Sequence, residues 1–391
     1  MEKIISTEKK PIKLWLPDLD PDTLQQAKNL ANLPGIYSHI AIMPDAHLGY
    51  GMPIGGVAAT ENTVIPNAVG VDIGCGVCAV KTSLTGIDRP TLKKILTSIR
   101  QHVPTGFKHQ RIAHAANRMP KPAGGLNLGD LPIVCQEYAS ATYQLGTLSG
   151  GNHFIEIQRD HHGHIWLMIH SGSRNLGHKV ASHYHHLAEE RNTRLPRPIP
   201  SAWQLAALTA SEAEGISYLA EMQYCVDFAH ANRAVMMERV IDAVQHHCTP
   251  VHIAELIDVA HNYAASEFHF GKEVIVHRKG AIRAGLGELG IIPGSQGANS
   301  SIVRGLGNAE SFCSCAHGAG RKLGRKQAQR QLDLRNEIAL LEKRHILHAI
   351  RGKRDLEEAT GAYKDIDEVL YRQRDLVTPL TTLEPLAVLK G

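Results

Sequence analysis

The chain has 391 residues and a formal net charge of +4, with 43% hydrophobic and 20% charged residues, so it is long enough for a substantial core and has an ordinary globular composition. No apolar run is long enough to cross a membrane, and the charged N-terminal segment lacks the apolar stretch of a secretory signal. These features predict a cytoplasmic protein, and the mild charge neither requires nor excludes a nucleic-acid partner.

The first half of the chain predicts short buried strands, helices and one long loop. Apolar runs between glycine and proline predict strands at 40–43, 54–58 and 68–73. Apolar periodicity predicts helices near 22–33, over 88–102 and over 135–146, and the segment rich in Pro, Gly, Lys and Arg at 104–132 predicts a loop. A hairpin is expected next, with strands near 154–158 and 165–169 and a turn at 161–164.

The second half predicts a helical block followed by a return to strands. We expect helices over 175–192, 202–247 and 252–266, with a proline-rich linker at 195–200, then strands and loops over 273–317 and a long charged helix over 322–351. Glycine-rich segments with the pattern of strands lie on both sides of the helices, so the two ends of the chain should meet in one core. The prediction is an α+β fold: a single large domain over 1–391, with a mixed β-sheet core, flanking helices and a helical insertion at about 175–266.

Histidine and cysteine usage points to metal or nucleophilic chemistry. The chain has 24 histidines, which suit both roles near neutral pH. Its 7 cysteines are odd in number and scattered. In a reducing compartment we therefore expect no disulfides, and a special cysteine would be a ligand or a nucleophile.

The first chemistry-bearing motif is a glycine-flanked turn that holds Asp72 and Cys75. The glycines permit a tight loop that turns both side chains toward one point. A carboxylate together with a thiolate suits a divalent transition metal rather than magnesium or calcium. The alternative is a buried structural cysteine. Cys75 and Cys78 also fit C-x-x-C, but a zinc knuckle needs a second such pair, and Cys313 and Cys315 are spaced C-x-C.

Three further histidines are candidate ligands. His153 and His170 lie at the outer ends of the predicted hairpin, and antiparallel pairing brings such ends together, so both imidazoles are expected at one metal centre. Each alone is more often a hydrogen-bonded structural residue, and it is their symmetric placement that favours ligation. His261 is expected on a helix face, where by itself it would be interpreted as a core histidine.

His317 precedes a run of small residues and then Arg321 and Lys322 at the expected start of a helix. Backbone N–H groups and cations at such a place can bind phosphate, and a neutral imidazole there can attack phosphorus without a strong base. The alternative is a glycine-rich helix entry with a surface histidine. The polar turn 292–300 is a candidate nucleotide contact or a plain loop, and it does not match a Walker A loop.

Seven motifs in order resemble those of the RtcB family of RNA ligases, from about residue 11 to the terminal Lys390 and Gly391. They lie at 43–47, 70–76, 151–156, 170–174, 261–262, 293–295 and 317–321. The resemblance implies an enzyme that joins RNA ending in a 2′,3′-cyclic phosphate or 3′-phosphate to RNA with a 5′-hydroxyl, in RNA repair or tRNA splicing. It also implies that the enzyme consumes GTP and needs Mn²⁺. Whether it requires an activating partner such as archease stays open.

The resemblance implies roles for the matched residues. Asp72, Cys75 and His153 would hold one Mn²⁺, and Cys75, His170 and His261 the second, with the Cys75 thiolate as the bridge. His317 would attack the α-phosphorus of GTP and become guanylylated. The GMP would then pass to the RNA 3′-phosphate, and the 5′-hydroxyl would displace it.

The resemblance also implies a GTP pocket in which Glu156 and Lys390 read guanine. Its expected residues are Asn152, His153, Phe154, Ile155, Glu156, His261, Asn262, Pro293, Gly294, Ser295, Gln296, Ser300, His317, Gly318, Ala319, Gly320 and Lys390. Arg174 and Arg321 are candidates for RNA or GTP phosphates, because arginine binds phosphate bidentately. Asp45 and His47 lie in a motif, but the sequence assigns them no role.

Two other classes of function compete with the ligase. A dinuclear phosphodiesterase would use the same carboxylate, thiol and imidazoles, but it needs neither a guanylylated His317 nor a guanine pocket around Lys390. A non-catalytic RNA-binding protein would have no use for the complete ligand set. The sequence therefore favours the ligase.

Overall fold

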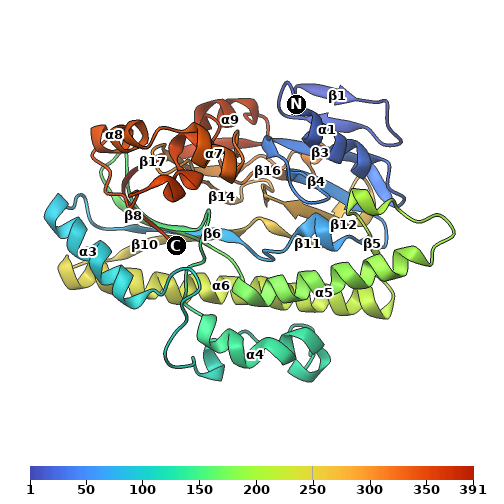
Figure 1. The fold of residues 1–391 in the computed structure, drawn as a ribbon, viewed down its shortest axis with the longest axis horizontal. Helices are drawn as coiled ribbons and strands as arrows, with labels where there is room; N and C mark the ends of the chain where they lie inside the picture. Colours follow the sequence, from blue (N-terminus) through green and yellow to red (C-terminus); the bar gives the residue numbers. More distant parts are fainter. Residues whose placement is uncertain (249) are drawn as a thin grey trace.

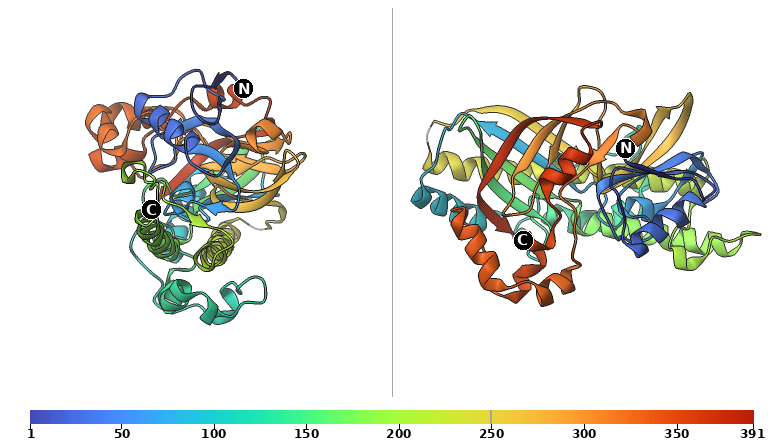
Figure 2. Two further views of the ribbon diagram at one scale, coloured as in Figure 1. Left: turned by 90° about the vertical axis from the view of Figure 1, so that its right-hand side faces the viewer. Right: turned by 90° about the horizontal axis from the view of Figure 1, so that it is seen from above.

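A computed structural model describes residues 1–248 and 250–391. Curved β-sheets form its middle layer, long helices run along one side of them, and short helices from the C-terminal third cover the other side (Figure 1). Figure 2 shows the long helices end-on, side by side between the sheets and α4. The long helices are α5 (Arg174–Thr193) and α6 (Ala213–His247), and α4 is Pro132–Gln144. The short C-terminal helices are α7 (Arg325–Gln331), α8 (Leu334–Lys343) and α9 (Ile366–Arg372).

One sheet joins the N-terminal strands to a hairpin from the second half of the chain. Its strands lie in the order β1-β2-β3-β4-β12-β11. Their bounds are β1 (Lys3–Ile5), β2 (Ile12–Leu14), β3 (Ile36–His47), β4 (Ile54–Thr60), β11 (Asn262–His269) and β12 (Lys272–Lys279). β2 and β3 run parallel, whereas β12 is antiparallel to both β4 and β11.

Another sheet carries the site, in the order β10-β6-β8-β7-β17-β15-β14. The bounds are β6 (Gly76–Thr82), β7 (Phe154–Asp160), β8 (Ile165–Ser171), β10 (Ile253–Ala260), β14 (Leu289–Ile292), β15 (Ser300–Gly305) and β17 (Val377–Lys390). The edge strands β10 and β14 contact each other, so the sheet curls toward a barrel. Small ribbons pair β5 (Thr63–Val64) with β9 (Leu208–Thr209) and β13 (Ala281–Arg283) with β16 (Ser314–Ala316).

Local sequence signals explain where helices begin. Before α1 (Pro21–Ala31), the Asp20 side chain accepts a hydrogen bond from the backbone of Thr23, and before α3 (Arg89–His102), Asp88 accepts one from Thr91. Such caps satisfy N–H groups that a helix start leaves unpaired, and proline in the first turn needs no such partner. The α2 helix (Pro66–Val69) also begins with proline and ends at Gly70, whose φ is +93°.

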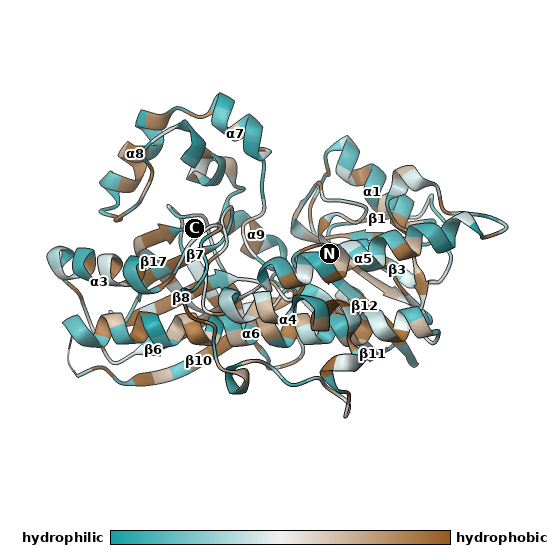
Figure 3. Ribbon diagram, turned by 60° about the horizontal axis from the view of Figure 1, so that its bottom comes forward, coloured by the Kyte–Doolittle hydropathy of each residue, from teal (hydrophilic) through white to brown (hydrophobic). Residues whose placement is uncertain are grey.

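The middle strands of the sheet that carries the site, β7 and β8, are buried. Ile155 and Ile157 of β7 lie in a hydrophobic cluster with residues of α3 and α6, whereas Phe154 lies in a cluster with residues of α8. Figure 3 shows hydrophobic and hydrophilic positions alternating along α3 and α6, as expected for helices with one buried face. Because neighbouring strand residues point to opposite faces, Glu156 shares its face with Phe154.

The structure confirms the α+β fold and several predicted elements. The helices expected near 22–33 and over 88–102, 135–146 and 175–192 correspond to α1, α3, α4 and α5, and the predicted hairpin is β7 and β8. Strands from both ends of the chain share the sheets, since β17 pairs with β7 and β4 with β12. Within 202–247, the helix α6 occupies 213–247.

Other predictions were wrong. Residues 68–73 form the end of α2 and a turn, because Gly70 adopts positive φ. The expected helix 252–266 is instead strands β10 and β11, whose pairing with β6 and β12 overrides the helix-forming residues. The helical insertion therefore ends with α6, and residue 249 lies outside the described residues. The expected helix 322–351 is divided into α7 and α8, because Asp333 caps a new helix start.

Among the residues that the structure describes, no helix is both long and apolar enough to span a membrane.

Candidate active site and metal centre

Neighbouring strands bring the predicted ligands to one end of a sheet. Cys75 directly precedes β6, and His261 directly follows β10, whose Ala260 is opposite Gly76. His170 lies near the end of β8, and His153 precedes β7. These strands are antiparallel neighbours in the order β10-β6-β8-β7. The ends of β10 and β8 therefore lie at the same end of the sheet as the starts of β6 and β7.

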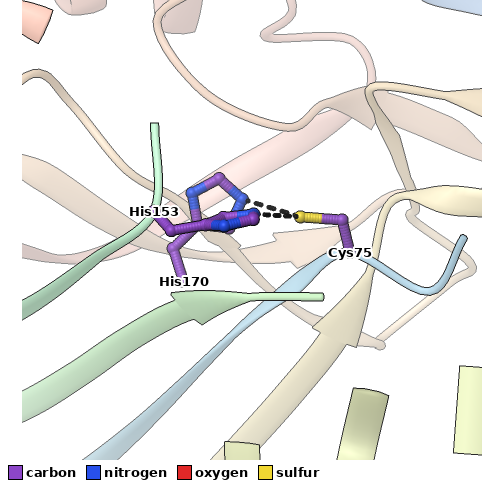
Figure 4. A group of neighbouring side chains, drawn as sticks. All are labelled: Cys75, His153 and His170. Atoms are coloured by element: carbon purple, nitrogen blue, oxygen red, sulfur yellow. Dashed lines mark hydrogen bonds between the residues drawn. The ribbon is translucent and has the colours of Figure 1, made fainter. Parts of the chain in front are cut away.

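The Cys75 thiol and two imidazoles form the centre of the cluster. Cys75 Sγ lies 3.2 Å from His153 Nε2 and 3.3 Å from His170 Nε2 (Figure 4). All three side chains are buried, and one ligand atom from each lies within 4.8 Å of the others. These three residues therefore present their metal-binding atoms toward one point, as the hairpin argument predicts.

Asp72 joins this cluster through a tight turn. Its Oδ2 lies 3.0 Å from His153 Nε2, and its backbone oxygen accepts hydrogen bonds from the N–H of Cys75 and the amide of Asn262. A Cβ at Gly172 would overlap the Asp72 carboxylate. The approach therefore requires glycine at position 172, directly after β8.

His261 connects the cluster to His317. Its ring centroid lies 5.1 Å from that of His170 and 4.7 Å from that of His317. Its backbone N–H donates to Cys75 O at 2.8 Å. His317 follows β16, and so the imidazoles predicted for metal binding and for nucleophilic attack share one site.

Burial and mutual proximity set the protonation of the cluster. Burial lowers the pKa of both His170 and His261 well below the ordinary value, and nearby histidines lower it further, so both rings are neutral near pH 7. Burial and the adjacent Asp72 raise the pKa of the Cys75 thiol well above its ordinary value. Burial works against ionisation of the Asp72 carboxyl, but His153, Cys75 and Arg174 together lower the Asp72 pKa overall.

The donor set fits a divalent transition metal. Carboxylate, thiolate and neutral imidazole are ligands that such ions accept together. Among the described residues, His153 Nδ1 and His261 Nδ1 are buried without a hydrogen-bond partner. Buried polar atoms of this kind are costly unless a ligand or water satisfies them.

Asp45 holds the His317 ring. The His317 Nδ1–H donates to Asp45 Oδ2 at 2.7 Å, and the His317 backbone N–H donates to the same oxygen at 3.2 Å. Since a carboxylate only accepts, Nδ1 carries the proton and Nε2 keeps its lone pair. A Cβ at Gly320, where φ is +72°, would overlap the Asp45 backbone, so glycine is needed there. This gives Asp45, which the sequence left without a role, a positioning role.

If His317 attacks GTP as the family resemblance implies, replacing Asp45 with asparagine is expected to slow that attack. The substitution keeps the volume but removes the charge that stabilises a positively charged imidazole ring, and a comparable change beside another catalytic histidine costs about 10⁴-fold. We expect on the order of 10³-fold slower protein labelling by α-labelled GTP. Bound manganese should be unchanged, because Asp45 contacts none of the expected ligands. Labelling at the wild-type rate would remove the positioning role.

Glu156 lies in a buried polar group beside the cluster. The Gln158 amide donates to Glu156 Oε2 at 2.6 Å and to Ser300 Oγ at 3.0 Å, and Ser300 Oγ also accepts from the Gly294 N–H. Burial raises the Glu156 pKa to about 7, against the opposing effect of Lys390. Three predicted nucleotide contacts, Glu156, Gly294 and Ser300, are thus brought together.

Lys390 lies at the end of β17 over the Phe154 ring, with Nζ 5.2 Å from the ring centroid. Its Nζ is 3.9 Å from Glu358 Oε2. Burial lowers the Lys390 pKa, against the attraction of Glu358 and Glu156. Phe154 in turn packs edge-on against His170 with ring centroids 5.4 Å apart, so the Lys390 end of the pocket adjoins the metal-type cluster.

The remaining predicted nucleotide contacts differ in what they can offer. Pro293, Gly294, Ser295 and Gln296 lie in the turn between β14 and β15, as expected, and the Gln296 amide donates to Glu358 O. Asn152 is partly exposed before β7, and Gly318, Ala319 and Gly320 follow His317. The Ile155 side chain packs in the core against α3 and α6, and only its backbone is left for a ligand.

The two predicted phosphate-binding arginines are already engaged by protein groups. Arg174 donates to Thr147 Oγ1, Ser149 Oγ and Gly106 O. Arg321 donates to Glu358 and to the backbone of residues 323 and 357. Both therefore hold loops around the site in this structure.

Sequence reasoning missed Glu358 and Arg325. Glu358 is buried, accepts from Arg321 and Tyr363, and lies near Lys390. The Arg325 guanidinium packs over the backbone of Gly151 and lies 3.5 Å from Glu358 Oε1. Neither residue belongs to a motif of known chemistry. The only indication in the sequence was the charged character of the surrounding segment.

The α+β fold thus brings a buried thiol and imidazole cluster that could hold a metal ion next to a carboxylate and the further imidazole of His317, an arrangement typical of an enzyme active site. The family model described as tRNA-splicing ligase RtcB matches residues 26–123 and 123–391. The chain is similar to the RNA-splicing ligase RtcB of Escherichia coli K12, with 39% identity over 100% of this chain and 99% of that protein. It is also similar to the tRNA-splicing ligase RtcB of Thermococcus kodakarensis, with 34% identity over 94% of this chain and 91% of the other. The protein therefore belongs to the RtcB family, a family of RNA ligases.

Proposed function

We propose that the protein is a GTP- and Mn²⁺-dependent RNA ligase that joins 2′,3′-cyclic phosphate or 3′-phosphate ends to 5′-hydroxyl ends. The observation that carries this proposal is the His317 ring, which Asp45 holds through Nδ1 at 2.7 Å and which lies beside His261. A free Nε2 next to a metal-type cluster suits attack on phosphorus, and a plain hydrolase has no need of it.

The metal ligands in this proposal are those predicted from the sequence. Asp72, Cys75 and His153 would hold one Mn²⁺, and Cys75, His170 and His261 the other. When bound, such ions neutralise phosphate charge and stabilise the leaving group. The contacts of Cys75 with both His153 and His170 support its place as the shared ligand.

His317 carries out the covalent step. Nε2 attacks the α-phosphorus of GTP, a P–N bond forms, and the α–β bond breaks to release pyrophosphate. Asp45 holds the Nδ1 proton while the ring gains positive charge. An oxygen of the RNA 3′-phosphate then displaces His317 to form an RNA–GMP diphosphate. The 5′-hydroxyl finally attacks the RNA phosphorus, and GMP leaves. A 2′,3′-cyclic phosphate is first opened by water.

The nucleotide would lie between β7, the turn at 293–299 and the end of β17. Glu156 is buried and can accept from the N–H groups of guanine in addition to the Gln158 amide. Lys390 stands beside it as a donor. The other proposed contacts are Asn152, Phe154, the backbone of Ile155, Asn262, Ser295, Gln296, Ser300 and the segment after His317. Arg174 and Arg321 would position phosphate-binding loops, and the need for an activating partner such as archease stays open.

Incubation with two RNA pieces tests the function directly. One piece carries a 3′-phosphate and the other a 5′-hydroxyl, and we expect joined RNA only with both GTP and Mn²⁺. A second reaction uses a 2′,3′-cyclic phosphate end. Opening of that ring without GTP and without any joined product would instead support the phosphodiesterase. No reaction of either substrate, with manganese bound, would contradict both.

A further inference from the structure

A loop beside the site presents an aromatic ring to solvent among cations. Phe107 is fully exposed, and it is followed by the exposed side chains of Lys108, His109 and Arg111. Exposing a whole phenyl ring costs free energy with no return inside the fold. The function described above does not use this feature.

The loop is held in place by its backbone. The N–H of Gly106 donates to Leu148 O at 2.9 Å, and the N–H of Gln110 donates to Tyr143 O at 2.9 Å. The Gln110 amide also donates to Gly146 O at 3.0 Å. Phe107 therefore lies in a loop whose backbone is hydrogen-bonded to the rest of the fold on both sides of it.

A basic groove lies next to this loop, between α3 and α6. The groove has a volume of about 740 Å³, and its lining includes the cationic side chains of Lys93, Lys94 and Arg239 together with the imidazoles of His102, His246 and His247. Asp242 is the acidic residue in that lining. Its excess of cations over carboxylates suits a polyanion.

Hydrogen bonds connect the groove, the loop and the site. Arg239 of the groove donates to Gly146 O at 2.9 Å, the same oxygen that accepts from Gln110 of the loop. At the other end, Arg174 donates to Gly106 O at 2.6 Å, and the charge of Asp72 acts on Arg174. The loop thus lies between Arg239 of the groove and Arg174 near the metal-type cluster, and the loop and the groove together are called this face below.

We propose that this face binds the body of a single-stranded RNA whose end lies at the active site, with a base stacked on Phe107 and the next phosphates in the groove between α3 and α6. The inference rests on the proposed function for the identity of the polyanion. Single-stranded nucleic acids are bound by aromatic platforms with cations along a groove. An acidic protein would also suit the groove, but it has no planar base to place on Phe107.

Fluorescence anisotropy of a labelled, unstructured RNA with a 3′-phosphate tests the platform, without GTP so that no reaction follows. Stacking on one aromatic side chain contributes enough that Phe107→Ala should raise the Kd about tenfold. Phe107→Trp should restore binding. The matched control is Phe268→Ala, which removes another exposed phenyl ring, on β11. Unchanged thermal unfolding of each variant shows that the fold is intact.

The groove is tested by the salt dependence of the same binding. Lys93→Glu with Lys94→Glu should weaken binding and lower the slope of log Kd against log salt by about 1.4, as expected for two lost phosphate contacts. Lys3→Glu with Lys9→Glu makes the same change in net charge on the N-terminal segment and should leave the slope unchanged. RNA binding like the wild type in both Phe107→Ala and the groove variant would overturn the proposal. Ligation by the wild type is measured separately, so failure of the ligase function is distinguishable from failure of this face.

Discussion

Replacing His317 with alanine is expected to abolish transfer of label from α-labelled GTP to the protein. The wild type should acquire a label that acid removes and alkali does not, as a P–N bond predicts. The substitution removes the attacking nitrogen, and loss of a catalytic nucleophile costs on the order of 10⁶-fold in rate. Labelling in the variant should therefore fall below detection in gel autoradiography.

Controls separate this loss from a general loss of histidine. His186→Ala makes the same change at an exposed position of α5 and should label like the wild type. Manganese content of the His317 variant should be unchanged if the ring acts on phosphorus rather than as a ligand. A label that survives the substitution would transfer the nucleophilic role to another residue.

The sequence predicted the centre of the site because its geometry is local. His153 and His170 flank one hairpin, and antiparallel pairing alone brings them together. Asp72 and Cys75 share one glycine-bounded turn. Short-range rules are enough for both pairs, so their juxtaposition needed no knowledge of the whole fold.

The rest of the site depends on pairing between distant segments. His261 was expected on a helix because alanine, glutamate and leucine around it favour one, whereas it follows a strand paired with β6. The contact between Asp45 and His317 joins residues 272 positions apart. Periodicity and spacing carry no information about such a contact, and the resemblance to a family supplied the residues without their partners.

Cys75 is the residue that both proposed ions would share. Cys75→Ala is expected to lose both, because its Sγ contacts His153 Nε2 at 3.2 Å and His170 Nε2 at 3.3 Å. Loss of a partner that only orients a ligand already costs 10- to 100-fold in metal affinity, so loss of the shared ligand should exceed about 100-fold. Manganese content after dialysis measures this, and GTP labelling should disappear with it.

Cys78→Ala is the matched control, since Cys78 is also buried, three positions further along, but its side chain packs in the hydrophobic cluster with α3 and α6. It should keep its manganese, which would also exclude a C-x-x-C metal site.

The pH dependence of manganese binding adds a second test. The metal-free Cys75 thiol has a raised pKa from burial and Asp72, so it is protonated at neutral pH and must release a proton when a metal binds. Below that pKa, apparent Mn²⁺ affinity of the wild type should rise about tenfold per pH unit from this group. Calorimetry in buffers of different ionisation enthalpy should detect the released proton, and full manganese binding by Cys75→Ala with unchanged proton release would contradict the shared thiolate.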